Sequence, residues 1–420
     1  MKILHISTAD TDGGASRAAY RLHDGLKRSG HDSHMYVRNK STNDGSVHRF
    51  NPSSGRFTWV LRNARRLWLE RSLNRYAKTS PTDRTYFSQD RTCFSRDAAA
   101  QIPKADLLHL HWIADFLDYG AFFDWLPKNL PLVWTLHDMA NFTGGCCYDM
   151  SCGKFTQKCG ACPQLGSSDE RDLTRDVWRR KQKYYEGLDP SRFHIVTPSR
   201  WLGEEVGRSS LFSALPRSVI PYGLDTEIFQ PRDRRVAREV LGIPQDAKVV
   251  LFVSYEIHTP RKGFSLLTEA LAGIKSPGKM FLLSLGSGPP PPFQFLPYVH
   301  IPALGDDRLL SWVYSAADVF VLPSLADNLP NTMLESIACG TPIVAFDAGG
   351  MPDAVRPGTT GLLARTGMSA ELRAAILELL GNDAKRTEMS ANCRRLALQE
   401  YSLDLQTQRY LHLYSTLLDL

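Results

Sequence analysis

The sequence predicts an α/β protein made of two doubly wound domains. Short apolar runs typical of buried strands alternate with helix-like segments along the whole chain. Such alternation builds parallel sheets that carry helices on both faces. The strand candidates are residues 2–7, 32–37, 107–112, 132–137 and 193–199 in the first half, and 248–254, 279–286, 299–303, 319–323 and 342–346 in the second.

A polar, proline-bearing segment at residues 215–233 separates the two series of strands and reads as an interdomain connection. We therefore expect an N-terminal domain at residues 1–215 and a C-terminal domain at 216–402, with a cleft between them. Residues 403–420 are expected to form a helix that packs back on the N-terminal domain.

The composition of the chain permits an enzyme. Of its 420 residues 43% are hydrophobic and 22% charged, which is ordinary for a globular protein of two or three domains. No apolar run reaches the roughly 18 residues of a membrane span, and the start of the chain has too short an apolar core for a signal peptide. We therefore expect a cytoplasmic protein. The net charge of +6 is too small to indicate nucleic acid, but it suits an anionic substrate or an anionic membrane surface.

Two carboxylates follow the strand candidate at 319–323. Asp327 lies in the loop after it, and Glu335 lies about halfway along a helix that starts near residues 328–331 and ends at Gly340. We expect Glu335 to be half-buried at best. Its two oxygens could accept hydrogen bonds from neighbouring hydroxyls of a sugar ring, although a salt bridge or an exposed helix face would also explain a helical glutamate.

Two more loops of the second half carry signals for anion binding. Arg261 and Lys262 stand just before a helix start, where free backbone amides and the helix dipole also favour an anion. Gly286 and Gly288 follow a strand and would let the backbone approach a ligand. Each signal alone could be a solvated pair of cations or a glycine turn, but three such loops on one sheet edge favour a site for an anion.

These residues carry a resemblance to a known family. The second half is similar to glycosyltransferase family 4 through "SAADVFVLPS", "DNLPNTMLESIACGTPIVAFDAGGMPD", "PRKG" and "VIPYGLDTEIF". The first half resembles a bacterial polysaccharide-biosynthesis branch of that family through "ISTADTDGGASRAAYRLHDGLKRSGHDS", "HLHWI" and "WTLHDMANFTGGC". The resemblance covers nearly the whole chain. It implies a retaining transferase of GT-B fold, in which two Rossmann-like domains face a central cleft.

The resemblance also implies roles on the donor side. Glu335 would hold the ribose of the nucleotide, Asp327 would lie near the transferred sugar, and Lys262 with Arg261 would contact the diphosphate. The family usually has Glu where this chain has Asp327, and often has Gly where it has Pro330, which has no N–H to donate. Backbone groups of Asn328, Leu329 and Asn331 would then serve the diphosphate, beside Gly286.

On the acceptor side, the resemblance implies a tight loop at Gly13 and Gly14. His137 would be the histidine near the reacting sugar, and with Asp327 and Lys262 it makes up the predicted catalytic set. His109 and His111 end the preceding strand candidate and could line the same cleft or belong to the core. Fixed cations and helix dipoles can stabilise the leaving diphosphate, so no catalytic metal or other cofactor is expected.

We therefore expect a retaining glycosyltransferase that moves a sugar from a UDP- or GDP-sugar to a saccharide or lipid-linked oligosaccharide in bacterial surface polysaccharide biosynthesis. A GT-B sugar-nucleotide epimerase would use the same donor site. A catalytically weakened subunit that binds a partner transferase is a further alternative, suggested by Asp327 and Pro330. A basic nucleic-acid binder is the least favoured alternative.

Five of the eight cysteines lie between residues 146 and 162. In a reducing cytosol such a cluster suggests zinc held by four thiolates, and we select Cys146, Cys152, Cys159 and Cys162 as a structural site. Their spacing is irregular beside familiar zinc motifs. Free or redox-active thiols, or an iron–sulfur site, therefore stay open.

Residues 56–78 contain seven basic residues and one acidic residue, Glu70. Apolar side chains recur at helical spacing between the cations, at Phe57, Val60, Leu61, Ala64, Leu67 and Trp68. A basic helix that carries tryptophan suits an anionic membrane surface, which would place the protein on the inner face of the cytoplasmic membrane. Alternatively, the apolar stripe packs on the N-terminal domain.

Overall fold

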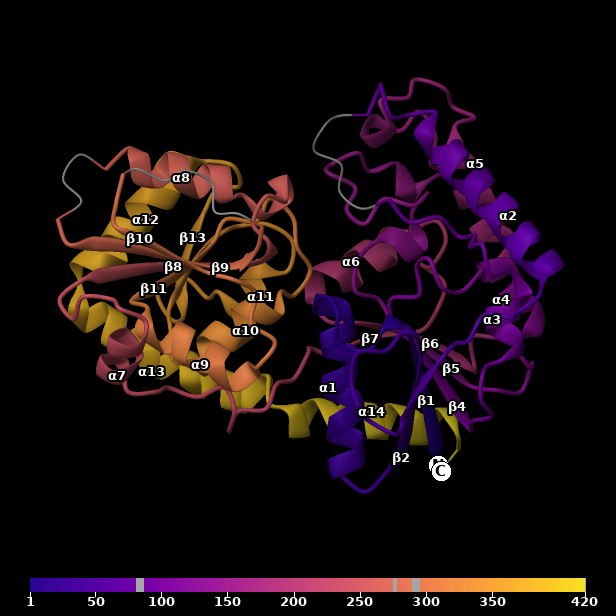
Figure 1. The fold of residues 1–420 in the computed structure, drawn as a ribbon, viewed down its shortest axis with the longest axis horizontal. Coiled ribbons are helices and arrows are strands. Elements are labelled where there is room, and N and C mark those ends of the chain that lie inside the picture. The colour runs from indigo at the N-terminus through magenta and orange to yellow at the C-terminus, as the bar shows by residue number, and fades with distance from the viewer. Residues whose placement is uncertain (81–86, 275–277, 289–294, 420) are drawn as a thin grey trace. The chain divides into compact units, whose positions relative to one another are not determined.

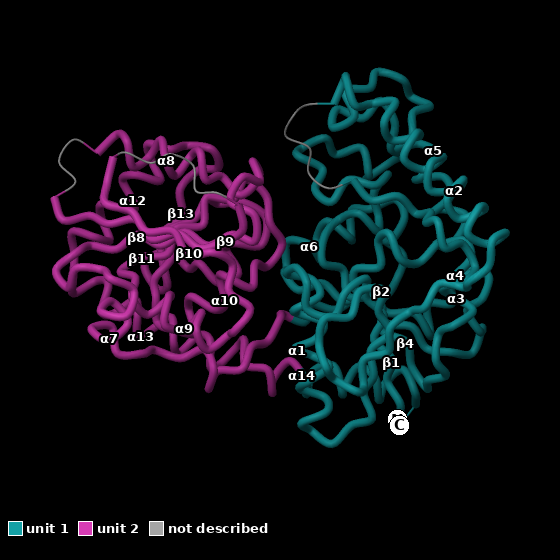
Figure 2. The backbone as a smooth tube through the Cα atoms, in the orientation of Figure 1, with its two compact units in different colours: residues 1–220, 407–420 teal, residues 221–406 magenta. Residues whose placement is uncertain are grey.

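The computed structural model describes residues 1–80, 87–274, 278–288 and 295–419. The chain forms two compact units, one of residues 1–220 with 407–420 and one of residues 221–406 (Figure 2). Each unit is a parallel β-sheet covered by helices (Figure 1). The predicted class of two doubly wound α/β domains is confirmed.

The first unit contains a seven-stranded sheet in the order β3-β2-β1-β4-β5-β6-β7, and its paired strands are parallel. The central strands β4 and β5 are buried on both faces, as expected where helices cover both sides of a parallel sheet. The strands are β1 Lys2–Ala9, β2 Asp32–Asn39, β3 Val47–Arg49, β4 Leu107–Leu110, β5 Leu132–Thr135, β6 Phe193–Thr197 and β7 Arg217–Val219. The helices are α1 Gly14–Arg28, α2 Arg56–Asn74, α3 Arg96–Ala100, α4 Tyr119–Trp125, α5 Leu173–Tyr185 and α6 Arg200–Arg208.

The last helix of the chain, α14 Leu403–Leu417, packs its C-terminal part on the first unit. Tyr410 and Tyr414 are buried in one apolar cluster with Ile3 of β1 and Leu22 of α1. The hydroxyl of Tyr414 lies 2.6 Å from Nδ1 of His109. The core of the first unit therefore includes side chains from both ends of the sequence.

The second unit contains a six-stranded parallel sheet in the order β10-β9-β8-β11-β12-β13. Its strands are β8 Lys248–Glu256, β9 Met280–Ser287, β10 Tyr298–Ile301, β11 Val319–Leu322, β12 Ile343–Phe346 and β13 Gly361–Ala364. Its helices are α7 Arg234–Val240, α8 Phe264–Ala272, α9 Asp307–Ala316, α10 Asn331–Ala338, α11 Met351–Ala354, α12 Ser369–Gly381 and α13 Asp383–Glu400. Short 3₁₀ turns occur at Ala140–Phe142, Lys154–Thr156, Pro163–Leu165 and Pro260–Lys262.

Three edge strands were not predicted from the sequence. β3 and β7 have three residues each and β13 has four, and all three strands are partly exposed, so no fully buried apolar run marks them. β7 lies at the start of the segment 215–233, so this segment does not serve as a connection alone. The same segment also pairs within the second unit, where Leu224 bridges Ser402.

The strand order of each sheet defines where a ligand is expected. In each sheet the first strands of the unit are added on one side of a central strand, and the later strands are added on its other side. The order reverses between β1 and β4 in the first unit and between β8 and β11 in the second. Ligands of doubly wound sheets bind outside the carboxyl ends of the strands at such a switch point. The loops that follow β1, β4, β8 and β11 are therefore the places to look for function.

The described part of the chain contains no helix that is both long enough and apolar enough to cross a membrane.

Candidate functional site

The switch point of the second unit brings together three of the predicted charged residues. The 3₁₀ turn Pro260–Lys262 follows β8, and Asp327 follows the neighbouring strand β11. Lys262 Nζ lies 2.5 Å from Asp327 Oδ2, and Arg261 Nη1 lies 3.3 Å from the same oxygen. Two cations that are distant in sequence from this carboxylate therefore converge on it.

The protonation states of this cluster follow from burial and charge together. Burial acts to raise the pKa of Asp327, but the adjacent Lys262 and Arg261 outweigh it and lower that pKa to about 2. Burial lowers the pKa of Lys262, while Asp327 acts in the opposite direction. The carboxylate is therefore ionised at neutral pH, and an anionic ligand would have to compete with it for the two cations.

The start of α10 lies beside this cluster. The helix begins at Asn331 after Pro330, which offers no side-chain cap to the free amides. Asn328 N–H donates to Asp327 Oδ1 at 3.1 Å, and both Asn328 and Leu329 are buried. A phosphate that used the Asn328 amide would therefore have to replace this hydrogen bond.

Glu335 is more buried than the sequence predicted. Its side chain is only 2% exposed, because α10 is covered by neighbouring elements of the second unit. Tyr314 of α9 donates its hydroxyl to Glu335 Oε2 at 3.0 Å. The expectation that Glu335 is half-buried at best was wrong, and so was the alternative of an exposed helix face. A buried carboxylate needs donors, and Tyr314 is one that the sequence did not reveal.

Glycines bring the loops of this site close together. Gly349, in the loop after β12, has φ +57°, and a Cβ there would lie 1.9 Å from the carbonyl oxygen of Asp327. Gly263 has φ +73°, and a Cβ there would lie 1.9 Å from the carbonyl oxygen of Pro323. By contrast, a Cβ at Gly286 would meet Ser254 O at 2.1 Å, so Gly286 is required by the approach of β8 and β9.

Ser324 is a further candidate that the sequence reading missed. Its hydroxyl is buried directly after β11 and has no hydrogen-bond partner among the described residues. A buried hydroxyl without a partner is costly unless something else satisfies it. It lies in "VLPS", which belongs to the family-like motif, but a serine in a loop carries too little information to be selected on its own.

The carboxyl edge of the first sheet carries a row of buried histidines. His5 lies in β1, His111 directly follows β4, and His137 follows β5. His5 Nδ1 lies 3.0 Å from His111 Nε2, and His111 Nδ1 lies 3.2 Å from His137 Nε2. The three imidazoles therefore form one hydrogen-bonded chain that ends at the predicted catalytic histidine.

Burial keeps these imidazoles neutral. It lowers the pKa of His137 to about 3, and it lowers the pKa of His5 and of His111 well below the usual value. His109 is a different case, because its two ring nitrogens contact Tyr414 Oη at 2.6 Å and Thr135 Oγ1 at 2.7 Å. These contacts assign His109 to the core of the first unit.

Ligand atoms of His5, His109 and His111 lie within 4.8 Å of one another, which is close enough for a metal ion. However, His5 bonds directly to His111, and both nitrogens of His109 have protein partners. The hydrogen bonds between these side chains account for their proximity.

Gly13 and Gly14 form the predicted tight loop at the start of α1. Gly13 has φ +84° and caps the helix without a side chain, and a Cβ at Gly13 would meet nothing within 4 Å. The backbone conformation therefore requires glycine here, and the helix start stays open on that side. The neighbouring Asp10 carboxylate is occupied, since it accepts hydrogen bonds from Ser41 and Thr42.

Comparison with known proteins covers both units. The family model Glycosyltransferase Family 4 matches residues 12–228, and the model Glycosyl transferases group 1 matches residues 247–382. The chain belongs to glycosyltransferase family 4. The family resemblance seen in the sequence is thereby confirmed.

Among characterised relatives, a D-inositol 3-phosphate glycosyltransferase of Geodermatophilus obscurus is 36% identical over 212 residues, 44% of this chain and 45% of the relative. A D-inositol 3-phosphate glycosyltransferase of Mycobacterium tuberculosis is 28% identical over 284 residues, 61% of this chain and 50% of that one. The chain thus spans about half the length of the curated relatives it matches.

Solved structures with this fold are glycosyltransferases of the GT-B type. Sucrose-phosphate synthase from Thermosynechococcus elongatus superposes with a TM-score of 0.68 at 20% identity, over 100% of both chains. Anabaena HepE in complex with UDP-glucose has a TM-score of 0.63 at 16% identity, over 99% of this chain and 100% of that one. WaaG, a glycosyltransferase involved in lipopolysaccharide biosynthesis, has a TM-score of 0.63 at 15% identity, over 97% of this chain and 98% of that one.

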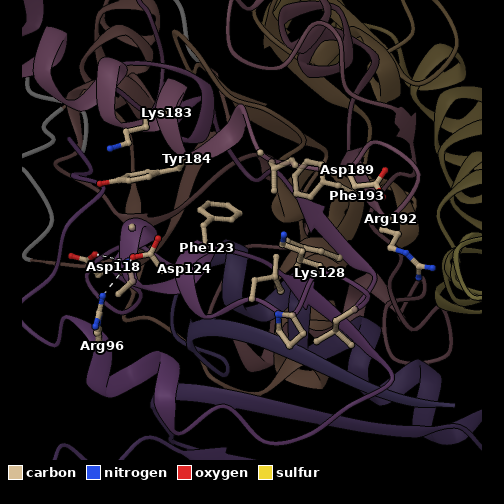
Figure 3. Close-up of a pocket in the computed structure, with 18 of the residues that line it drawn as sticks. Arg96, Asp118, Phe123, Asp124, Lys128, Lys183, Tyr184, Asp189, Arg192 and Phe193 are labelled. Atoms are coloured by element: carbon tan, nitrogen blue, oxygen red, sulfur yellow. Dashed lines mark hydrogen bonds and ion pairs between the residues drawn. The ribbon is translucent and has the colours of Figure 1, made fainter.

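A cavity of about 880 Å³ lies away from the switch points. Its lining includes Leu132 and Phe193, the first residues of β5 and β6, so it opens at the amino edge of the first sheet, whereas His137 follows the carboxyl end of β5. Figure 3 shows this cavity, with the ion pair of Arg96 and Asp124 (3.7 Å) on one side and Arg192 on the other. We do not include this cavity in the candidate site.

The basic segment of the chain forms helix α2 (Figure 1). All of α2 belongs to the described residues, and none of its side chains is buried. The exposed fraction is 74% for Phe57, 59% for Leu67 and 52% for Trp68. The alternative that the apolar stripe packs on the N-terminal domain is therefore wrong. Arg65 is not available as a free cation, because it bonds Asp118 at 2.6 Å and the carbonyl of Thr92 at 2.7 Å.

Proposed function

We propose that this family member is a retaining glycosyltransferase that takes a sugar from a UDP- or GDP-sugar and transfers it to a saccharide or lipid-linked oligosaccharide in bacterial surface polysaccharide biosynthesis. The convergence of Lys262 and Arg261 on Asp327 at the switch point of the second unit carries the donor part of this proposal. The UDP-glucose complex of HepE, a protein of the same fold, supports a nucleotide-sugar donor.

In the proposed reaction, the bond from the sugar carbon C1 to the diphosphate oxygen breaks, and its electron pair stays on the diphosphate. The acceptor hydroxyl oxygen forms the new bond to C1 on the same face, and its proton passes to the departing diphosphate oxygen. Negative charge therefore develops on the leaving group, where Lys262 and Arg261 with the α10 start would stabilise it. Retention is inferred from the resemblance to a retaining family.

The other residues have proposed roles that follow the resemblance. Glu335 would accept hydrogen bonds from the ribose hydroxyls, and Asp327 would turn from Lys262 to a sugar hydroxyl when the diphosphate binds. His137 would present a neutral imidazole to the sugar, since burial lowers its pKa to about 3. The backbone of Asn328, Leu329 and Asn331 would face the diphosphate, and the Gly13–Gly14 loop and His111 would belong to the acceptor side.

We further propose that α2 is a foothold on an anionic membrane surface, where a lipid-linked acceptor would be found. The exposed cations of the helix and its exposed aromatic side chains support this role. WaaG, whose fold is the same, is involved in lipopolysaccharide biosynthesis. The protein would then work on the inner face of the cytoplasmic membrane.

The test begins with the donor. Thermal unfolding in the presence of UDP-, GDP- and ADP-sugars should identify the nucleotide, since a ligand at 100 times its Kd stabilises the fold by about 2.7 kcal/mol. With the stabilising donor and a lipid-linked oligosaccharide, NMR of the product should show the anomeric configuration of the donor. An inverted product would overturn the retaining mechanism, and a donor that epimerises without any acceptor would favour the epimerase.

A further inference from the structure

Four cysteines surround one small cavity in the first unit. Cys146, Cys152, Cys159 and Cys162 all line a space of about 20 Å³, although sixteen positions separate the first from the last. Cys147, the neighbour of Cys146, does not line it. The fold thus selects four of the five clustered cysteines, and the space that they enclose is the size for a single ion.

The segment that carries these cysteines has little regular structure of its own. Between β5 and α5, residues 136–172 contain only three 3₁₀ turns. Met150, Ser151 and Ala161 have positive φ, at 49°, 65° and 43°, a strained conformation for residues with a side chain. Long loops without helices or strands are uncommon, and a cross-link would stabilise this one in addition to the packing of Phe142 and Phe155 in the core.

Groups with hydrogen-bonding capacity lie around the cavity. Gly144 N–H donates to Cys159 Sγ at 3.1 Å. The Lys154 side chain lines the cavity. Hydrogen bonds from outer groups to first-shell ligands are a regular feature of metal sites.

We propose that Cys146, Cys152, Cys159 and Cys162 bind one Zn²⁺ as a structural, four-thiolate site. Four thiols lose their protons to solvent as the metal binds, no electron is transferred, and the resulting charge of −2 is offset by Lys154 and by the Gly144 N–H. A single-ion cavity disfavours an iron–sulfur cluster. The four sulfurs are not as close together as the ring nitrogens of His5, His109 and His111, so ligation draws them inward.

The proposed site would support two functional elements. Cys147 accepts a hydrogen bond from Met139 N–H at 2.9 Å, two residues after His137. On the other side, Thr79 donates to the Leu165 carbonyl at 2.8 Å, just after the end of α2. The metal would therefore hold in place both the loop that carries His137 and the end of α2.

Elemental analysis of protein purified without chelators tests the site, and it requires neither donor nor acceptor. We expect one zinc per chain, release of that zinc by a thiol-modifying reagent, and a tetrahedral tetrathiolate absorption spectrum after substitution with Co²⁺. Cys159→Ser should lose the metal and become sensitive to proteolysis within residues 144–166. Cys147→Ser, a matched control, should retain it.

Three results would overturn the proposal: iron in place of zinc, no tight zinc after reconstitution of the reduced protein, or equal metal loss in Cys147→Ser and Cys159→Ser. If Cys159→Ser does not fold, proteolysis of the wild-type protein before and after chelation still tests whether the metal stabilises the cysteine segment. Cleavage confined to the cysteine segment after chelation is expected, and an unchanged pattern contradicts a structural role. Because no sugar donor is involved, failure of this test leaves the proposed transferase function standing.

Discussion

Lys262 and Asp327 form a partly buried ion pair in which Nζ and Oδ2 are 2.5 Å apart. Both residues have proposed roles toward the donor, so the cation proposed to contact the phosphate is paired with a carboxylate of the same site. This arrangement avoids an unpaired buried charge, which would be costly. It also means that donor binding has to exchange one partner of Lys262 for another.

The first prediction follows from that exchange. Asp327→Asn removes the competing carboxylate, so the affinity for the nucleoside diphosphate should rise by about 1.4 kcal/mol, or roughly tenfold. Turnover should fall, because the contact to the transferred sugar is lost. Isothermal titration with the nucleoside diphosphate, together with a turnover assay, measures both effects.

Lys262→Ala is the companion variant. It should lower turnover more than donor affinity, since the charge on the leaving diphosphate is largest in the transition state. A variant with normal turnover would mean that the phosphate contact lies elsewhere. Weaker diphosphate binding in Asp327→Asn would contradict the competition between ligand and carboxylate.

Glu335 is the subject of the second prediction. Glu335→Ala should weaken nucleotide binding by about 1.5 to 3 kcal/mol, the typical contribution of hydrogen bonds to a charged group. Tyr314→Phe is the matched control, because it removes the internal donor to Glu335 and leaves the carboxylate in place. Its effect on affinity should be much smaller. Unchanged nucleotide affinity in Glu335→Ala, measured by titration calorimetry, would remove this residue from the site.

The sequence predicted the members of the donor site better than their interactions. Arg261, Lys262 and Asp327 were expected on one sheet edge, because parallel strands bring their following loops together. That Lys262 and Asp327 pair with each other could not be foreseen, since it depends on side-chain positions across two loops sixty-five residues apart. The burial of Glu335 was missed for a similar reason, because the pattern along α10 does not reveal which elements cover it.

The same limit applies to the fold. Fully or almost fully buried central strands, such as β8 and β11, were predicted from their apolar runs, while the partly exposed edge strands β3, β7 and β13 were not. The histidine chain was out of reach as well. His5, His111 and His137 come from three strands, and only the sheet order β1-β4-β5 makes them neighbours.

Gly349→Ala provides the third prediction, about the loop that braces Asp327. The added methyl group would lie 1.9 Å from the Asp327 carbonyl oxygen at a positive φ, so the loop must shift. Gly358→Ala is the control, since Gly358 also has positive φ but nothing lies within 4 Å of its Cβ position. The control substitution should lower the free energy of unfolding by about 1 to 2 kcal/mol, because alanine disfavours a positive φ.

The Gly349→Ala variant should lose more stability than this control and should also bind donor more weakly. Urea unfolding compares the free energies of the two variants, and calorimetry compares their donor affinities. Equal loss in both variants would show that the contact with Asp327 is not restrictive.

The fourth prediction concerns pH. Burial lowers the pKa of His5, His109, His111 and His137 in the folded protein, to about 3 for His137. The unfolded chain therefore binds more protons than the folded one as pH falls below about 6.5, the ordinary pKa of histidine. The free energy of unfolding should therefore be unaffected by these histidines above that pH. Below it, this free energy should decrease by up to about 1.4 kcal/mol per histidine for each pH unit.

Urea unfolding at pH 7.5 and 5.5 measures this decrease. His111→Asn should show a shallower dependence on pH than the wild type, whereas His412→Gln, a change at an exposed position of α14, should not. A stability that does not change between these two pH values would contradict the burial of neutral histidines.

The last prediction concerns α2 and the membrane. Each Lys or Arg near an anionic leaflet contributes about 1 kcal/mol, and burial of exposed Phe57 and Trp59 adds an apolar term. The protein should therefore sediment with vesicles of anionic lipid but not with vesicles of neutral lipid, and salt should release it. Arg65 is left unchanged in the test because it bonds Asp118.

Charge reversal of Arg56, Arg71 and Arg75 to Glu should remove at least about 3 kcal/mol of binding, more than a hundredfold in affinity. The matched control reverses three exposed cations elsewhere, Lys104, Arg179 and Arg308, and so has the same net charge. If the control lost binding equally, attraction would come from the overall charge. Donor hydrolysis in the α2 variant should persist, because the proposed donor residues lie in the other unit. Equal affinity for neutral and anionic vesicles, or no affinity for either, would contradict a role of α2 at the membrane.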